Sequence, residues 1–178
     1  MKRDDAIQQL RTARKELQET IAGLTEEDFL RPRAISKWTL KDLLAHVASW
    51  DEEMVRVLQT FTMPVESVYT YTISDRNGFA AWNEEQLEMR RARAVSEIIS
   101  EFEIARRDLI QVVEGLTDPV LNRTRMTPWG EPSSGFGLIE TQIEHDREHA
   151  EQVRSYRKKI ERWQRARQKL TQKRKTKK

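Results

Sequence analysis

Apolar residues recur every three or four positions along four long segments of the chain, which is the spacing of amphipathic helices. The segments cover about residues 7–24, 40–61, 95–116 and 137–170, and a shorter helix is expected over 79–89. Only six glycines and five prolines are present, too few for the many turns of an all-β fold. The pattern therefore predicts an all-α fold, a four-helix bundle with the apolar stripes facing inward.

Local signals mark the ends of the first two helices. Thr39 stands before the second helix as an N-cap, and Asp42 follows three residues later in the capping-box position. Gly23 lies near the end of the first apolar stripe and Pro64 follows the second, where helices usually terminate. These residues support helix boundaries close to those given by the periodicity.

Two connections are longer than a simple bundle needs. About thirty residues separate the second helix from the third, and a second crossover covers about 117–136. We expect these long crossover loops to cover an open end of the bundle.

The fourth helix is longer than its partners. From Gly137 to Leu170 it would extend about 51 Å, against about 30–35 Å for the others, so its C-terminal part should overhang the bundle. Ile160 and Trp163 continue its apolar stripe into this extended C-terminal helix. An exposed apolar face needs a partner: the bundle itself, a second copy, nucleic acid or an anionic membrane surface.

The net charge of +3 hides two regions of opposite sign. Residues 154–178 hold 13 Lys/Arg and one acid, whereas residues 1–153 hold 19 Lys/Arg and 28 Asp/Glu. We expect a bundle domain over 1–157, followed by a basic helical extension and disordered tail over 158–178. Any affinity for nucleic acid would therefore come from the basic tail alone.

Composition excludes several classes of protein. The chain has no Cys, so it has no disulfide, thiolate metal site or cysteine nucleophile. A mean hydropathy of −0.80 without a long apolar run predicts no membrane span. The first twenty residues are too charged for a signal peptide, which favours a cytoplasmic location.

The three histidines suggest a metal site. His145 and His149 are four residues apart on the fourth helix, so both rings can reach one ion. His46 lies on a flank of the second helix that faces a neighbouring helix. Three His ligands leave a coordination position open for water or substrate, and neutral imidazoles suit Zn, Ni, Fe or Cu. Packed or hydrogen-bonded histidines without a metal are the alternative.

Residues 145–149, HDREH, also match the H-x-x-E-H motif of inverted zinc proteases. A protease of that type needs an acidic ligand well downstream, where only Glu151 and Glu161 remain. We therefore do not favour this interpretation.

Other side chains are candidates for a pocket near the histidines. Trp50 follows His46 by one turn, and Trp38, Trp129 and Tyr69 could line the same space. The alternative is that these aromatic residues only anchor the core and the loops. Glu148 is a candidate general base, or else part of a solvated helix face.

At these residues the chain resembles the DinB/YfiT-like superfamily. Residues 38–50, WTLKDLLAHVASW, resemble its second-helix signature W-[ST]-x-K-D-x-x-A-H-x-x-x-W, and His145-x-x-x-His149 resembles its last-helix pair. The Trp-rich second helix and residues 79–83, FAAWN, also resemble the ClbS/DfsB branch, whose best-known member protects its producer against a genotoxic metabolite. The resemblance covers about residues 4–157.

The resemblance implies an up-up-down-down four-helix bundle with one divalent metal, usually zinc or nickel, held by His46, His145 and His149. It also implies a homodimer and a small-molecule substrate. Members of known activity are hydrolases, or transferases and isomerases that use a low-molecular-weight thiol. Our first hypothesis is a metal-dependent hydrolase or thiol S-transferase that acts on a small electrophile in stress or detoxification. The second is a non-enzymatic protein that binds nucleic acid or an anionic surface through its basic C-terminal helix.

Overall fold

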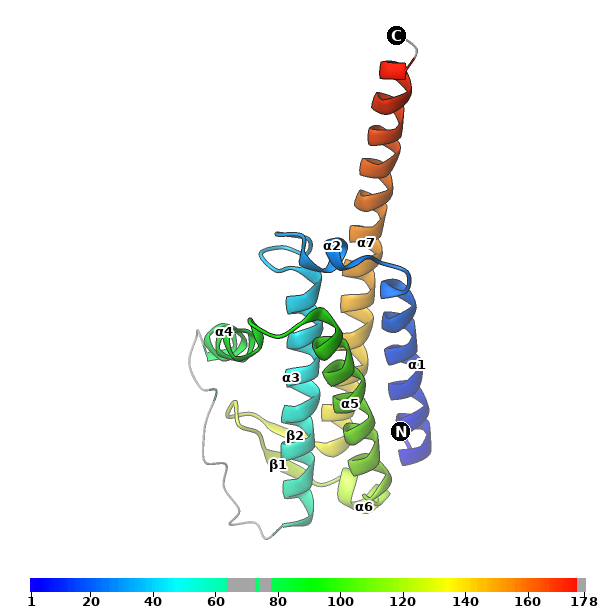
Figure 1. The fold of residues 1–178 in the computed structure, drawn as a ribbon. Helices are drawn as coiled ribbons and strands as arrows, with labels where there is room; N and C mark the ends of the chain where they lie inside the picture. Colours follow the sequence, from blue (N-terminus) through cyan, green and yellow to red (C-terminus); the bar gives the residue numbers. More distant parts are fainter. Residues whose placement is uncertain (64–72, 74–77, 176–178) are drawn as a thin grey trace.

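Four long helices form the protein, as the periodicity predicts (Figure 1). The structure is a computed structural model that describes residues 1–63, 73 and 78–175, with side chains described through 167 and at 169. The bundle helices are α1 (Arg3–Ile21), α3 (Leu40–Gln59), α5 (Val95–Glu114) and α7 (Gly135–Lys175). The all-α bundle is therefore confirmed.

The helix directions follow the expected topology. In chain order the four helices run up, down, down and up in the view of Figure 1. α1 packs most extensively along α7, and α3 along α5, so each helix has a parallel neighbour. Taken around the bundle from α7 through α1, α5 and α3, the order is up-up-down-down.

The predicted signals set the helix boundaries. Thr39 Oγ1 accepts a hydrogen bond from the backbone N–H of Asp42 at 3.0 Å, and the Asp42 carboxylate accepts one from the N–H of Thr39 at 3.0 Å. This capping box satisfies backbone donors that would otherwise be unpaired at the start of α3. Gly23, just after α1, has a φ of 73°, a left-handed conformation that glycine adopts without strain.

Shorter elements occupy the connections. They are α2 (Glu26–Leu30), the 3-10 helix η1 (Thr60–Thr62), α4 (Gly78–Arg90), α6 (Asp118–Leu121), and the antiparallel strands β1 (Thr124–Met126) and β2 (Pro132–Ser134). α3 ends at the lower end of the bundle and α5 begins at the upper end, and α4 is the expected helix between them in the chain (Figure 1). The connection from α5 to α7 stays at the lower end, because these helices are antiparallel, and it folds into the small hairpin.

The apolar core has two parts, one toward each end of the bundle. The upper part includes Leu17, Phe102 and Val153, and the lower part includes Leu10, Leu109 and Ile143. The boundary between the two parts lies within the bundle, at the level of Arg14, Asp51, Arg106 and Asp146.

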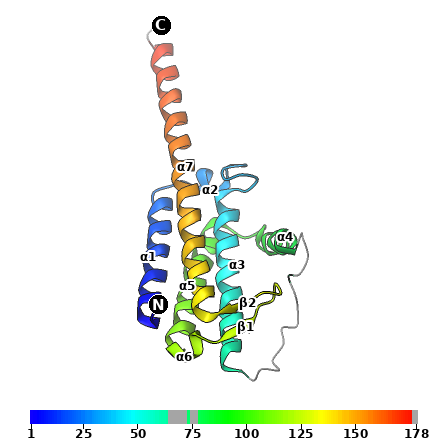
Figure 2. The same ribbon diagram turned by 180° about the vertical axis from the view of Figure 1, so that it is seen from behind.

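α7 extends far beyond its neighbours (Figures 1 and 2). It contains 41 residues, about 60 Å of helix. The predicted overhang is thus confirmed, with Ile160 buried against the bundle and Trp163 half-exposed beneath the guanidinium of Arg31. Across the described residues, no helix combines the length and apolar character needed to cross a lipid bilayer.

Candidate metal centre

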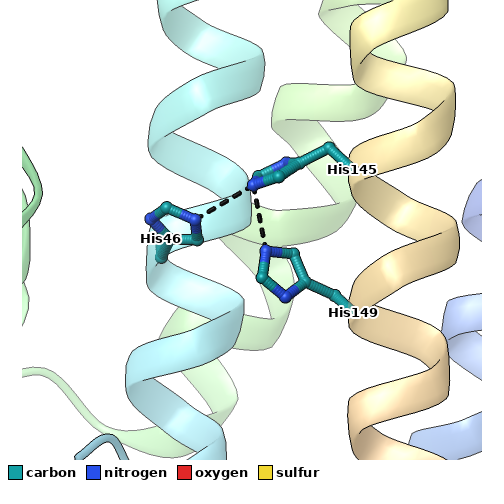
Figure 3. A group of neighbouring side chains, drawn as sticks. All are labelled: His46, His145 and His149. Carbon is teal, nitrogen blue, oxygen red and sulfur yellow. Dashed lines mark hydrogen bonds between the residues drawn. The ribbon is translucent and has the colours of Figure 1, made fainter. Parts of the chain in front are cut away.

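The three histidines of the chain meet between α3 and α7 (Figure 3). His46 projects from α3, and His145 and His149 project from successive turns of α7. His145 Nε2 lies 3.0 Å from His46 Nε2 and 2.9 Å from His149 Nε2. The i, i+4 spacing on α7 and the packing of α3 beside it therefore direct three ring nitrogens to one point.

A fixed hydrogen-bond chain determines which nitrogen of His46 carries the proton. The indole Nε1–H of Trp50 can only donate, and it does so to Asn83 Oδ1 at 3.0 Å. The same oxygen lies 3.1 Å from His46 Nδ1, which must therefore be the protonated nitrogen. The Nε2 lone pair of His46 is consequently directed at the cluster.

An equivalent chain sets the tautomer of His149. The Glu148 carboxylate can only accept, and it receives the Gln152 side-chain N–H at 3.1 Å. This orients Gln152 Oε1 toward His149 Nδ1, at 3.0 Å. His149 Nδ1 is therefore the donor, and its Nε2 lone pair also faces the cluster.

His145 completes a donor set that suits a cation. Its Nε2 faces two lone pairs but can donate a proton to only one of them, and its buried Nδ1 has no hydrogen-bond partner among the described residues. A cation shared by the three nitrogens would satisfy all three lone pairs. Ligand nitrogens around a tetrahedral zinc ion lie about 3.3 Å apart, and here two of the three pairs lie 2.9 and 3.0 Å apart, with all three nitrogens within 4.8 Å of one another. The residues present thus fit a divalent metal.

Burial keeps the three rings neutral, which is the form that binds metal. Burial, with a smaller contribution from the neighbouring His149, lowers the pKa of His46 to about 3 against the opposing effect of the Asn83 hydrogen bond. Burial also lowers the pKa of His145 well below its usual value, with contributions from the other two histidines. Burial lowers the pKa of His149, and its hydrogen bond to Gln152 acts in the opposite direction.

A buried network of four charges adjoins the histidines. Arg14 contacts Asp51 at 2.6 Å and Asp146 at 3.0 Å, and Arg106 contacts the same two carboxylates at 2.9 and 3.0 Å. The four side chains are at most 5% exposed and come from α1, α3, α5 and α7, one from each helix. Because Asp146 follows His145 directly, the network fixes α7 against α3 at the level of the cluster.

A cavity of about 480 Å³ opens beside His145. One part of its lining is aromatic, formed by Trp50, Phe79 and Trp129, whose ring centroids lie 5.8–6.3 Å apart. The remaining lining residues are Met54, Glu131, Pro132, Ser133, Leu138, Thr141 and Gln142. This size and mixed lining are typical of small-molecule sites.

The structure distributes the other predicted site residues differently. Trp50 and Trp129 line the cavity, whereas the ring of Trp38 lies against His46, with centroids 4.8 Å apart. Glu148 is exposed and contacts Gln152, so its observed role is to orient that amide. Tyr69 lies outside the described residues.

Sequence analysis missed the residues around the ligands. Asn83 belongs to the FAAWN segment, but nothing in that segment marks it as a site residue, because α4 has no clear apolar periodicity. The charge network did carry a signal: Arg14, Asp51, Arg106 and Asp146 each stand within the apolar stripe of their own helix, two positive and two negative.

Comparison with known proteins agrees with this fold. The family model of the DinB superfamily matches residues 9–153. The chain belongs to the DinB superfamily. A search of curated proteins returned no match.

Solved structures of several DinB-like proteins share the fold. YfiT from Bacillus subtilis, described as a probable metal-dependent hydrolase with an unusual four-helix bundle topology, is 16% identical with a TM-score of 0.69, over 89% of this chain and 87% of that one. ClbS, solved in complex with double-stranded DNA, is 9% identical with a TM-score of 0.74, over 88% and 96%.

A mycothiol-dependent maleylpyruvate isomerase is 11% identical, with a TM-score of 0.72 over 86% of this chain. The chain spans only 61% of the isomerase's length. At these identities the likenesses establish the DinB fold and no more.

Proposed function

We propose that this DinB-superfamily protein binds one divalent metal, zinc or nickel, and catalyses hydrolysis or thiol transfer on a small electrophile. The observation that carries the proposal is the convergence of three imidazole nitrogens. His145 Nε2 lies within hydrogen-bond distance of both His46 Nε2 and His149 Nε2, and the lone pairs of His46 and His149 are directed toward the cluster. Without a cation, nitrogen lone pairs face one another unfavourably, and a bound cation would accept all of them.

Different residues of the chain would have different roles around the ion. The three neutral imidazoles would hold it, and Asn83 and Gln152 would keep His46 and His149 in the ligating tautomer. When bound, the metal supplies a Lewis acid that lowers the pKa of a coordinated water or thiol. The aromatic side of the cavity would position the apolar part of a substrate beside His145, since Trp50 and Trp129 line the space that His145 also lines.

The neighbours support this choice of chemistry. YfiT is described as a probable metal-dependent hydrolase, and the isomerase as mycothiol-dependent, so both a hydrolase and a use of a low-molecular-weight thiol are reasonable for this chain. A role in stress or detoxification, a homodimer and a cytoplasmic location remain predictions. Light scattering of the purified protein would test the dimer.

The decisive experiment measures metal content. The intact protein, purified without chelator, should contain about one zinc or nickel per chain, and His46→Ala and His149→Ala should each lose most of it. Gln8→Leu, on the exposed face of α1, is the matched control. Full metal content in both His variants would overturn the site. A thiol-conjugation and hydrolase screen with the loaded protein then distinguishes the two reaction classes.

A further inference from the structure

The extension of α7 is a second feature that the metal centre does not explain. Residues 158–175 hold nine Lys/Arg and one Glu, and they lie outside the segment 9–153 that the family model matches. The segment is helical throughout and projects from the bundle in both views (Figures 1 and 2). Its charge is therefore presented on a regular and accessible scaffold.

Four cations of the extension share one face. Lys158, Arg162, Arg165 and Lys169 are spaced i, i+4, i+7 and i+11, so their Cα positions fall within about 60° on a helix. All four residues are exposed. The row is about 16 Å long at ~1.5 Å per residue, comparable to several phosphate spacings along a nucleic-acid strand.

These positive charges are poorly compensated within the chain. Glu161 is the single acid of the segment, and it pairs with Arg165 at 3.3 Å. In the described part of the chain, Lys158, Arg162 and Lys169 form no salt bridge. Like charges four residues apart destabilise a helix, so an anionic partner would stabilise this one.

The chemistry of the extension selects among possible anionic partners. Over the described stretch 161–169, Trp163 is the one large apolar side chain, and it is already covered on one side by Arg31. Insertion into a membrane interface needs a broad apolar face, which this stretch does not offer. Two such extensions side by side would repel each other, since each carries a net charge of +8 over 158–175. A polyanion with regularly spaced phosphates remains.

We propose that the extension from residue 158 binds the phosphate backbone of double-stranded nucleic acid, independently of the metal centre. The contacts would come from the row Lys158, Arg162, Arg165 and Lys169. Lysine and arginine contacts to phosphates carry no base information, so the binding should be insensitive to sequence and strongly dependent on salt.

Fluorescence anisotropy of a labelled mixed-sequence DNA duplex with the full chain tests this proposal. Four phosphate contacts predict a slope of log K against log salt of about −3.6, which is roughly a 150-fold loss of affinity between 50 and 200 mM salt. The double variant Arg162→Gln/Lys169→Gln should halve the slope to about −1.8, roughly a 12-fold loss over the same range. The control Lys15→Gln/Arg107→Gln removes two exposed cations of α1 and α5 and should leave the slope unchanged.

Three results would overturn the proposal. One is no binding at low salt, and another is an equal slope in both double variants and the parent. The third is tighter binding to phosphatidylserine vesicles than to the duplex, with a blue shift of the tryptophan emission. Binding to the duplex by His46→Ala/His149→Ala should equal that of the parent, so failure of the metal site and failure of this proposal give different results.

Discussion

Asn83 offers the sharpest test of how the metal centre is built. Its Oδ1 accepts two hydrogen bonds, from Trp50 Nε1 at 3.0 Å and from His46 Nδ1 at 3.1 Å. Asn83→Leu keeps a similar shape but removes both, so His46 becomes free to rotate or to change tautomer. Loss of such a ligand-orienting hydrogen bond typically lowers metal affinity about 10–100-fold, or about 1.4–2.7 kcal/mol. We expect the zinc affinity of Asn83→Leu to fall within that range.

Competition titration of zinc against a chromophoric chelator, near neutral pH, measures the effect. Asn83→Asp keeps both acceptor contacts and adds a negative charge beside His46, so it should bind zinc at least as tightly as the parent. Gln8→Leu controls for the loss of an exposed amide. A zinc Kd for Asn83→Leu within twofold of the parent would refute the argument that Asn83 fixes the His46 tautomer.

Three further predictions follow from the same site. Glu148→Ala releases the Gln152 amide and should weaken zinc binding in the same titration, but by less than Asn83→Leu, because Gln152 itself remains. Asp51→Ala leaves Arg14 and Arg106 under-compensated and should lower the free energy of unfolding by about 3–5 kcal/mol in urea denaturation, whereas the half-exposed Asp108→Ala should change it by under about 0.5 kcal/mol. Burial depresses the folded-state pKa of all three histidines, so the unfolded chain binds more protons below about pH 6.5. The metal-free protein should therefore keep the histidine contribution to its stability above pH 6.5. As the pH falls from 6.5 toward each folded-state pKa it should lose up to about 1.4 kcal/mol per histidine per pH unit, and a pH-independent urea midpoint between pH 7 and 5 would contradict this.

The helices were predictable because their signals are local. The apolar period placed α5 at Val95–Glu114 almost residue for residue, and Thr39 with Asp42 placed the start of α3. The α5–α7 connection was harder to anticipate. Its three-residue strands pair Thr124 with Ser134 across a hairpin too short to show alternation.

The ligands were predictable for a similar reason, and their supporting residues were not. His145 and His149 are linked by helix geometry, and His46 faces them because α3 packs beside α7. Asn83 lies on α4, 37 residues from His46 along the chain. Its contact with His46 therefore depends on where α4 lies on the bundle. No periodicity encodes that position.

The charge network explains why the histidines meet at all. It lies between the two apolar parts of the core, with one charged side chain from each of the four helices. A slip of one turn would separate Asp146 from Arg14 and Arg106 and leave buried charges unpaired, which is strongly unfavourable. A buried charge network adds little net stability compared with apolar packing. It does make one register of α7 much lower in free energy than the neighbouring registers. Because Asp146 is adjacent to His145, that register is also the one in which His145 and His149 face His46, so the polar layer and the metal centre depend on the same alignment of α3 and α7.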